Sequence, residues 1–113
     1  MNVAIDNLLT AIKTDYANYQ DASSMQSERT KETRAQMREE FFNSLKYSVG
    51  QKYIKVIKDR SVWGFVVNTT EDKKFRYGDI LKAAGYSTPA RNSARGNVFE
   101  DYDVRWTGPN YLR

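Results

Sequence analysis

The apolar residues of this 113-residue chain change their period at Gly50. Before that glycine they recur every three or four residues, which is the spacing that gives a helix one apolar face. After it, residues 53–58 and 62–67 alternate in the manner of strands and are rich in β-branched and aromatic side chains. A helical first half and a strand-rich second half predict an α+β fold, with helices and sheet segregated along the chain.

Two helices are predicted before Gly50. The first carries one apolar stripe, formed by Ile5, Leu8, Leu9, Ile12, Tyr16 and Tyr19. Ser23 and Gln26 have the spacing of a capping box, so a second helix is expected to start near Ser24 and to run to Val49, where Gly50 can end it. Its C-terminal part repeats apolar side chains at every fourth position, namely Met37, Phe41, Leu45 and Val49. We expect that part to pack on the core and the polar N-terminal part to project.

The second half predicts a small sheet. The runs 53–58 and 62–67 are separated by turn-forming residues and are expected to pair as a hairpin. Two late strands are expected near residues 97–99 and 104–106. We predict a single domain over residues 1–113. In it, an N-terminal helical hairpin packs on a small, strongly bent antiparallel sheet or an SH3-like or OB-like partial barrel. Residues 1–50 are its helical part and residues 51–113 its β-rich, basic part.

The absence of Cys and His excludes several kinds of chemistry. A Cys/His zinc site, a cysteine nucleophile and a Ser-His-Asp triad cannot be built without these residues. We therefore expect a non-enzymatic protein with no catalytic residues, no metal and no cofactor. The lack of disulfides, of a signal-peptide pattern and of a long apolar stretch leads us to expect a cytoplasmic protein that makes no use of a membrane.

Positive charge is concentrated in the second half. Residues 51–113 hold twelve Lys and Arg against seven Asp and Glu, a net charge of +5, whereas the first half has a net charge of −1. No acidic residue occurs between Asp79 and Glu100. Within this interval or just before it, the candidates for contact with phosphate are Lys82, Arg91, Arg95 and Arg76. Lys52 and Lys55 of the first hairpin are expected to help them, or alternatively to protect an exposed strand from pairing with another chain. The alternative is an ordinary solvated loop whose arginines bond carbonyls or acids such as Glu100.

Aromatic side chains are interleaved with these cations. Trp63 lies in an apolar run and is expected to be buried, whereas Tyr77, Tyr86 and Trp106 have polar neighbours and are candidates for stacking on bases. Together with the cations they predict a nucleic-acid-binding protein. The triplet that begins at Glu71 matches an E-x-K nuclease fragment, but it falls in a polar turn, so an enzyme is the last alternative.

Three segments of the second half resemble small uncharacterised proteins of tailed bacteriophages. These segments are residues 75–84 (FRYGDILKAA), 89–97 (PARNSARGN) and 104–109 (VRWTGP). The resemblance implies a viral protein that acts in a bacterial cytoplasm or in a particle, and it carries no functional residues with it.

Protein partners form the other class of interpretation. A phage protein could bind and inhibit a host enzyme or defence component through the polar part of the second helix, using Glu28, Arg29, Lys31 and Arg34. A structural role in the virion is a third interpretation. A homodimer that buries Met25 and Met37 is a further expectation.

Overall fold

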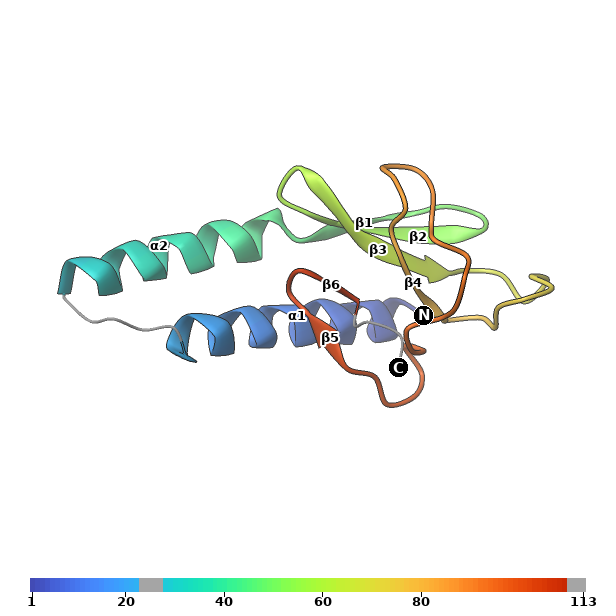
Figure 1. The fold of residues 1–113 in the computed structure, drawn as a ribbon, viewed down its shortest axis with the longest axis horizontal. Coiled ribbons are helices and arrows are strands. Elements are labelled where there is room, and N and C mark those ends of the chain that lie inside the picture. The colour runs from blue at the N-terminus through green and yellow to red at the C-terminus, as the bar shows by residue number, and fades with distance from the viewer. Residues whose placement is uncertain (23–27, 110–113) are drawn as a thin grey trace.

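A four-stranded antiparallel sheet is covered on one face by α1, and α2 runs back along α1 (Figure 1). The structure is a computed structural model that describes residues 1–22 and 28–109, with side chains described for residues 1–21 and 32–109. Its elements are α1 (Asn2–Ala22), α2 (Glu28–Ser44), β1 (Lys46–Val49), β2 (Tyr53–Lys58), β3 (Ser61–Val67), β4 (Ile80–Lys82), β5 (Val104–Arg105) and β6 (Gly108–Pro109). The strand order is β1-β2-β3-β4, and β5 and β6 form a separate pair. The predicted α+β class, with its helices at the N-terminus, is confirmed.

The apolar stripe of α1 forms half of the main core. Ile5, Leu8 and Ile12 are completely buried and share one apolar cluster with Ile54 and Val66 of the sheet. Burial of side chains of this size stabilises a fold by about 1.5–3 kcal/mol each. Neither helix, over the residues described, has both the length and the apolarity needed to cross a membrane.

The predicted hairpin is formed by β2 and β3, and a bulge in it sets the direction of one tryptophan. Val56 faces Gly64 and Ile57 faces Val62, so Trp63 is the extra residue. The bulge turns Trp63 toward α1, where it joins the main core, and its indole N–H donates to a backbone carbonyl of β5 at 2.8 Å. The predicted burial of Trp63 is confirmed at 2% exposure.

The other face of the sheet is covered by chain without regular structure. A second apolar cluster lies there, formed by Phe65, Val67, Phe75 and Leu81. The segment 83–96 packs over it, since Ala83 and Ala94 contact the cluster. Backbone hydrogen bonds tie this segment to β4: the N–H groups of Ala90 and Arg95 donate to Lys82 and Ile80 at 2.7 Å each.

The second helix is shorter than predicted. It ends at Ser44, and the next residues form edge strand β1, which pairs with β2. The prediction of a helix to Val49 is wrong because every-fourth-residue spacing also fits a helix followed by a strand: Leu45 is buried, whereas Val49 is 61% exposed. Gly50 does not end a helix, since its N–H bonds the carbonyl of Tyr53 at 2.9 Å in the turn between β1 and β2. The expected capping box lies outside the described residues.

The late strands also differ from the prediction. Asn97 forms only an isolated bridge with Asp79, and the strand expected at residues 104–106 is the two-residue β5. The four-stranded sheet of the described chain is open and no closed barrel forms.

Polar side chains hold the projecting ends of the helices together. Gln20 is buried, and its amide donates to the carbonyl of Arg34 at 2.9 Å and accepts from Arg38 at 2.7 Å. Arg34 in turn donates to the carbonyl of Gln20 at 2.5 Å and lies 3.5 Å from the carboxylate of Asp21. The helices held together by these contacts project past the sheet, and the molecule is 52 Å in its longest dimension. The predicted projection of the polar part of α2 is visible in Figure 1.

Candidate functional site

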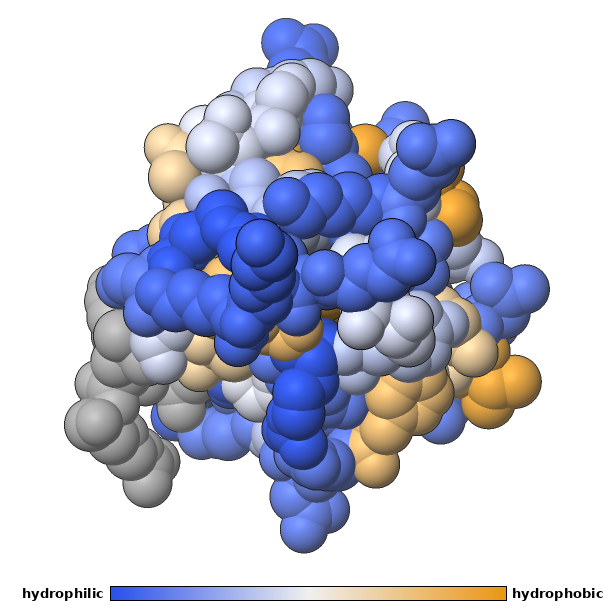
Figure 2. All heavy atoms as spheres, turned by 90° about the vertical axis from the view of Figure 1, so that its right-hand side faces the viewer, coloured by the Kyte–Doolittle hydropathy of each residue, from blue (hydrophilic) through white to orange (hydrophobic). Residues whose placement is uncertain are grey.

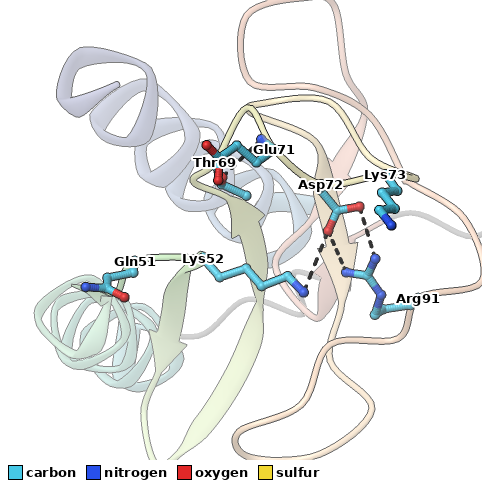
Figure 3. Close-up of a pocket in the computed structure, with 7 residues that line it drawn as sticks. All are labelled: Gln51, Lys52, Thr69, Glu71, Asp72, Lys73 and Arg91. Atoms are coloured by element: carbon cyan, nitrogen blue, oxygen red, sulfur yellow. Dashed lines mark hydrogen bonds and ion pairs between the residues drawn. The ribbon is translucent and has the colours of Figure 1, made fainter.

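The candidate site is a cavity of about 500 Å³ (Figure 3). It lies between the β1–β2 turn, the loop after β3 and one residue of the segment 83–96. The turn and the loop that form it lie at the end of the sheet away from the projecting helix ends (Figure 1). We call it the sheet-end hollow, and its lining residues are Gln51, Lys52, Thr69, Glu71, Asp72, Lys73 and Arg91.

Asp72 is the fixed centre of the sheet-end hollow. Its side chain is 1% exposed and accepts two hydrogen bonds of 3.0 Å from Arg91. The backbone N–H groups of Lys74 and Phe75 donate to the same carboxylate at 2.8 and 2.9 Å. The hydrogen bonds from Arg91, followed by those from the two backbone groups, hold the pKa of Asp72 well below its usual value. This acid is therefore ionised, buried and fully engaged.

Arg91 fastens the segment 83–96 to the sheet. Besides Asp72, its guanidinium donates to the hydroxyl of Tyr53 and lies 4.9 Å from the ring centre of Phe75. The hydrogen bond to Asp72 raises the pKa of Arg91. Arg91 was predicted to contact phosphate, but its guanidinium is engaged by Asp72, an acid from a turn 19 residues earlier.

Two cations of the sheet-end hollow remain accessible at its rim. Lys52 reaches in from the β1–β2 turn with its side chain 56% exposed and its amine 3.9 Å from Asp72 (Figure 3). Lys73 lies on the other side of Asp72, is exposed, and makes no ion pair with any residue that the structure describes. The lining holds three cations and two acids, a net charge of +1, and one of those acids is already neutralised by Arg91.

The other predicted phosphate contacts are spread over separate places. Lys82 is exposed at the end of β4, and Arg95 is half-buried, with its backbone N–H bonded to the carbonyl of Ile80. The ammonium of Lys55 lies 4.2 Å from the ring centre of Tyr86, which is 64% exposed as predicted. None of these residues lines the sheet-end hollow.

Arg76 is engaged in an exposed ion pair. Its guanidinium makes two hydrogen bonds of 2.8 Å to Glu100 and lies 3.7 Å from Asp79. The pairing raises the pKa of Arg76 and lowers that of Glu100. The predicted alternative, in which loop arginines bond nearby acids, therefore describes Arg76 better than a free phosphate contact does.

Trp106 lies far from the sheet-end hollow, within the helical layer. Its ring centre is 5.1 Å from Tyr16, 5.2 Å from Tyr19 and 5.7 Å from Phe41. Its backbone N–H donates to the carboxylate of Asp15 at 2.8 Å. Trp106 was predicted to stack on bases; the structure places its ring half-buried against both helices, away from the sheet-end hollow.

Tyr77 forms a pair with a second aromatic ring, Phe99, which was not predicted as a site residue. The rings of Tyr77 and Phe99 stack with centres 5.5 Å apart and planes 21° apart, and Phe99 is 53% exposed. Buried Asn97 fixes this ring pair, because its amide donates to the carbonyl of Tyr77 at 3.0 Å and its oxygen accepts from the N–H of Phe99 at 2.9 Å. Gly78 has φ +90°, and a Cβ there would lie 2.7 Å from the Phe99 ring. Only glycine therefore permits this arrangement without a shift.

The E-x-K triplet does not present a metal site. The carboxylate of its middle residue, Asp72, accepts hydrogen bonds from Arg91 and from two backbone N–H groups. Glu71 therefore has no second accessible acid in the triplet with which to bind a metal ion. Over the described ranges, no three Asp, Glu, His or Cys side chains gather closely enough to hold a metal ion.

Most of the residues predicted to bind a partner protein have side chains that the structure does not describe. The side chains of Glu28, Arg29 and Lys31 fall outside the described residues, as does Met25, whereas Arg34 is held by Gln20 and Asp21. Met37 is 50% exposed.

No family model, curated protein or solved structure matches the chain. The resemblance of its second half to tailed-bacteriophage proteins stays a prediction. The case for a binding function therefore rests on the geometry and charge of the site.

Proposed function

We propose that this protein binds single-stranded nucleic acid without catalysing a reaction on it. The observation that carries the proposal is the charge arrangement of the sheet-end hollow. Lys52 and Lys73 lie on opposite sides of an acid that Arg91 has already neutralised. Nucleic acid is the anionic partner that best uses both this hollow and an exposed stacking surface.

A phosphate group in the hollow would meet several donors. Lys52 and Lys73 supply ammonium groups from its rim. The hydroxyl of Thr69 accepts from the backbone N–H of Glu71 at 3.1 Å, so its own hydrogen can point toward a ligand. Under this proposal Arg91 shapes the hollow, and the two lysines make the phosphate contacts.

The ring pair offers a place for a base. Phe99 has no polar group to explain its exposure, yet Asn97 and Gly78 hold it in one position. Such pre-organisation reduces the entropy lost when a base stacks on the ring. A stacked base typically contributes about 1–3 kcal/mol. Tyr86, which is also exposed, is a second candidate for stacking.

The end of the molecule that carries the sheet-end hollow is hydrophilic over most of its surface (Figure 2). Proteins that bind single strands typically combine a positively charged groove with aromatic side chains on which bases stack. We extend the proposal to its setting: the phage resemblance favours a role on nucleic acid in an infected bacterial cell.

The test is fluorescence anisotropy of a labelled oligonucleotide titrated with protein that has been freed of nucleic acid by nuclease and high salt. We expect binding at about 50 mM salt that weakens steeply by about 200 mM, because contacts with phosphate release counterions. We expect the single strand to compete better than a duplex of the same sequence. A flat anisotropy trace at low salt for both DNA and RNA would remove the proposal.

A further inference from the structure

A second cavity, of about 310 Å³, lies on the helical side of the molecule. It is formed by α1, α2, the β2–β3 turn and Trp106, and it shares no lining residue with the sheet-end hollow. We call it the helix-side hollow, and its lining residues are Tyr16, Met37, Glu40, Phe41, Ser44, Asp59 and Trp106.

Three aromatic rings meet in the helix-side hollow, two of them stacked and the third perpendicular to both. Tyr16 and Phe41 stack with centres 4.2 Å apart, and Trp106 stands at 85° and 89° to them. Ring faces attract cations through their quadrupole. The ring of Trp106 already shows this behaviour, since the ammonium of Lys58 lies 5.1 Å from its centre.

Two carboxylates accompany these rings. Glu40 on α2 and Asp59 in the β2–β3 turn are both exposed, and neither forms an ion pair with a residue that the structure describes. Glu40 accepts one hydrogen bond, from the amide of Gln36 at 3.3 Å. The lining of the helix-side hollow thus holds two acids and no base, and the cation beside it is Lys58, over the ring of Trp106.

We propose that the helix-side hollow binds a lysine or arginine side chain of a partner protein. Its charged end lies between Glu40 and Asp59, and its alkyl stem lies along Phe41 and Trp106, as long basic side chains commonly pack. The half-exposed thioether of Met37 adapts to the stem. Nucleic acid is disfavoured here because two carboxylates repel phosphate, and a bare metal ion is disfavoured because rings rather than oxygens form most of the lining.

The test compares two capped pentapeptides, Gly-Ala-Lys-Ala-Gly and its analogue with norleucine in place of lysine. Norleucine keeps the length and apolar stem and removes the charge. Binding is followed by NMR through the indole N–H signal of Trp106, with the signal of buried Trp63 as an internal reference. We expect the lysine peptide to bind about fivefold to thirtyfold more tightly, the range expected for a cation beside rings and acids.

The double variant Glu40→Gln with Asp59→Asn is expected to abolish this preference, because it removes both charges and keeps both shapes. The matched control is Glu39→Gln with Asp101→Asn, two exposed acids outside the hollow, which should retain the preference. Equal affinity of the two peptides for the wild-type protein, or no shift of the Trp106 signal with either, would overturn the proposal without any variant. Retention of the preference in the first double variant would also overturn it. These outcomes are independent of nucleic-acid binding at the other end of the molecule.

Discussion

Removal of the two rim lysines should change the salt dependence of binding by a calculable amount. For single-stranded ligands, each lost phosphate contact reduces the slope of log affinity against log salt by about 0.7. Loss of Lys52 and Lys73 therefore makes the slope shallower by about 1.4. Over a fourfold rise in salt, from about 50 to about 200 mM, the wild-type protein should lose about sevenfold more affinity than the double variant.

The assay is anisotropy with a labelled oligonucleotide at several salt concentrations, on Lys52→Ala with Lys73→Ala. The control is Lys46→Ala with Arg60→Ala, which removes the same charge from exposed positions outside the sheet-end hollow. The control variant should keep a slope of log affinity against log salt near that of the wild type. This slope reflects the number of phosphate contacts and not the total charge of the protein. If the rim variant binds with an unchanged slope, the two lysines do not meet phosphate and the reasoning from the hollow fails.

Three further changes test the ring pair, the hollow and the sheet. Phe99→Ala should weaken single-strand binding by about 1–3 kcal/mol with the salt slope unchanged, and an unchanged affinity would show that no base stacks there. Asp72→Asn should lower the Tm at pH 7. Because Arg91 lowers the pKa of Asp72, the stabilisation by its carboxylate is complete above about pH 4 and is lost progressively as the pH falls from there toward the lowered pKa. The difference in Tm between the variant and the wild type, measured by circular dichroism, should therefore shrink steadily below about pH 4. Parallel curves at all pH values would contradict that linkage. Gly64→Ala should destabilise the fold by about 1–3 kcal/mol in chemical denaturation, because the new Cβ would lie 2.8 Å from the carbonyl of Leu81, and a wild-type midpoint would contradict that contact.

Local patterns were sufficient where the structure depends on neighbours in sequence. The stripe containing Ile5, Leu8 and Ile12 predicted α1, and the alternation around residues 53–67 predicted the β2–β3 hairpin, because each face is set by side chains a few positions apart. The end of α2 was not predictable in this way. Pairing with β2 turns residues 46–49 into a strand, and that pairing is a tertiary contact which no local periodicity records.

The candidate site depended more heavily on distant partners. Lys52 was identified by charge, but the role of Arg91 is decided by Asp72, 19 residues away, and that of Trp106 by Asp15, 91 residues away. Sequence shows that opposite charges exist without showing which of them meet. One feature of the sequence could have indicated the ring pair, namely Gly78. Its positive φ and missing side chain allow the ring of Phe99 to lie against the backbone.

NMR mapping of an oligonucleotide onto the protein tests nucleic-acid binding at the sheet end most directly. An oligonucleotide of about ten nucleotides is titrated into ¹⁵N-labelled protein at low salt, a length within the usual site size of such proteins. We predict that amide shifts concentrate at residues 51–53, 69–75 and 97–99, with little change in α1 and α2. Shifts confined to the helices, or no shifts at all, would contradict the proposed binding surface.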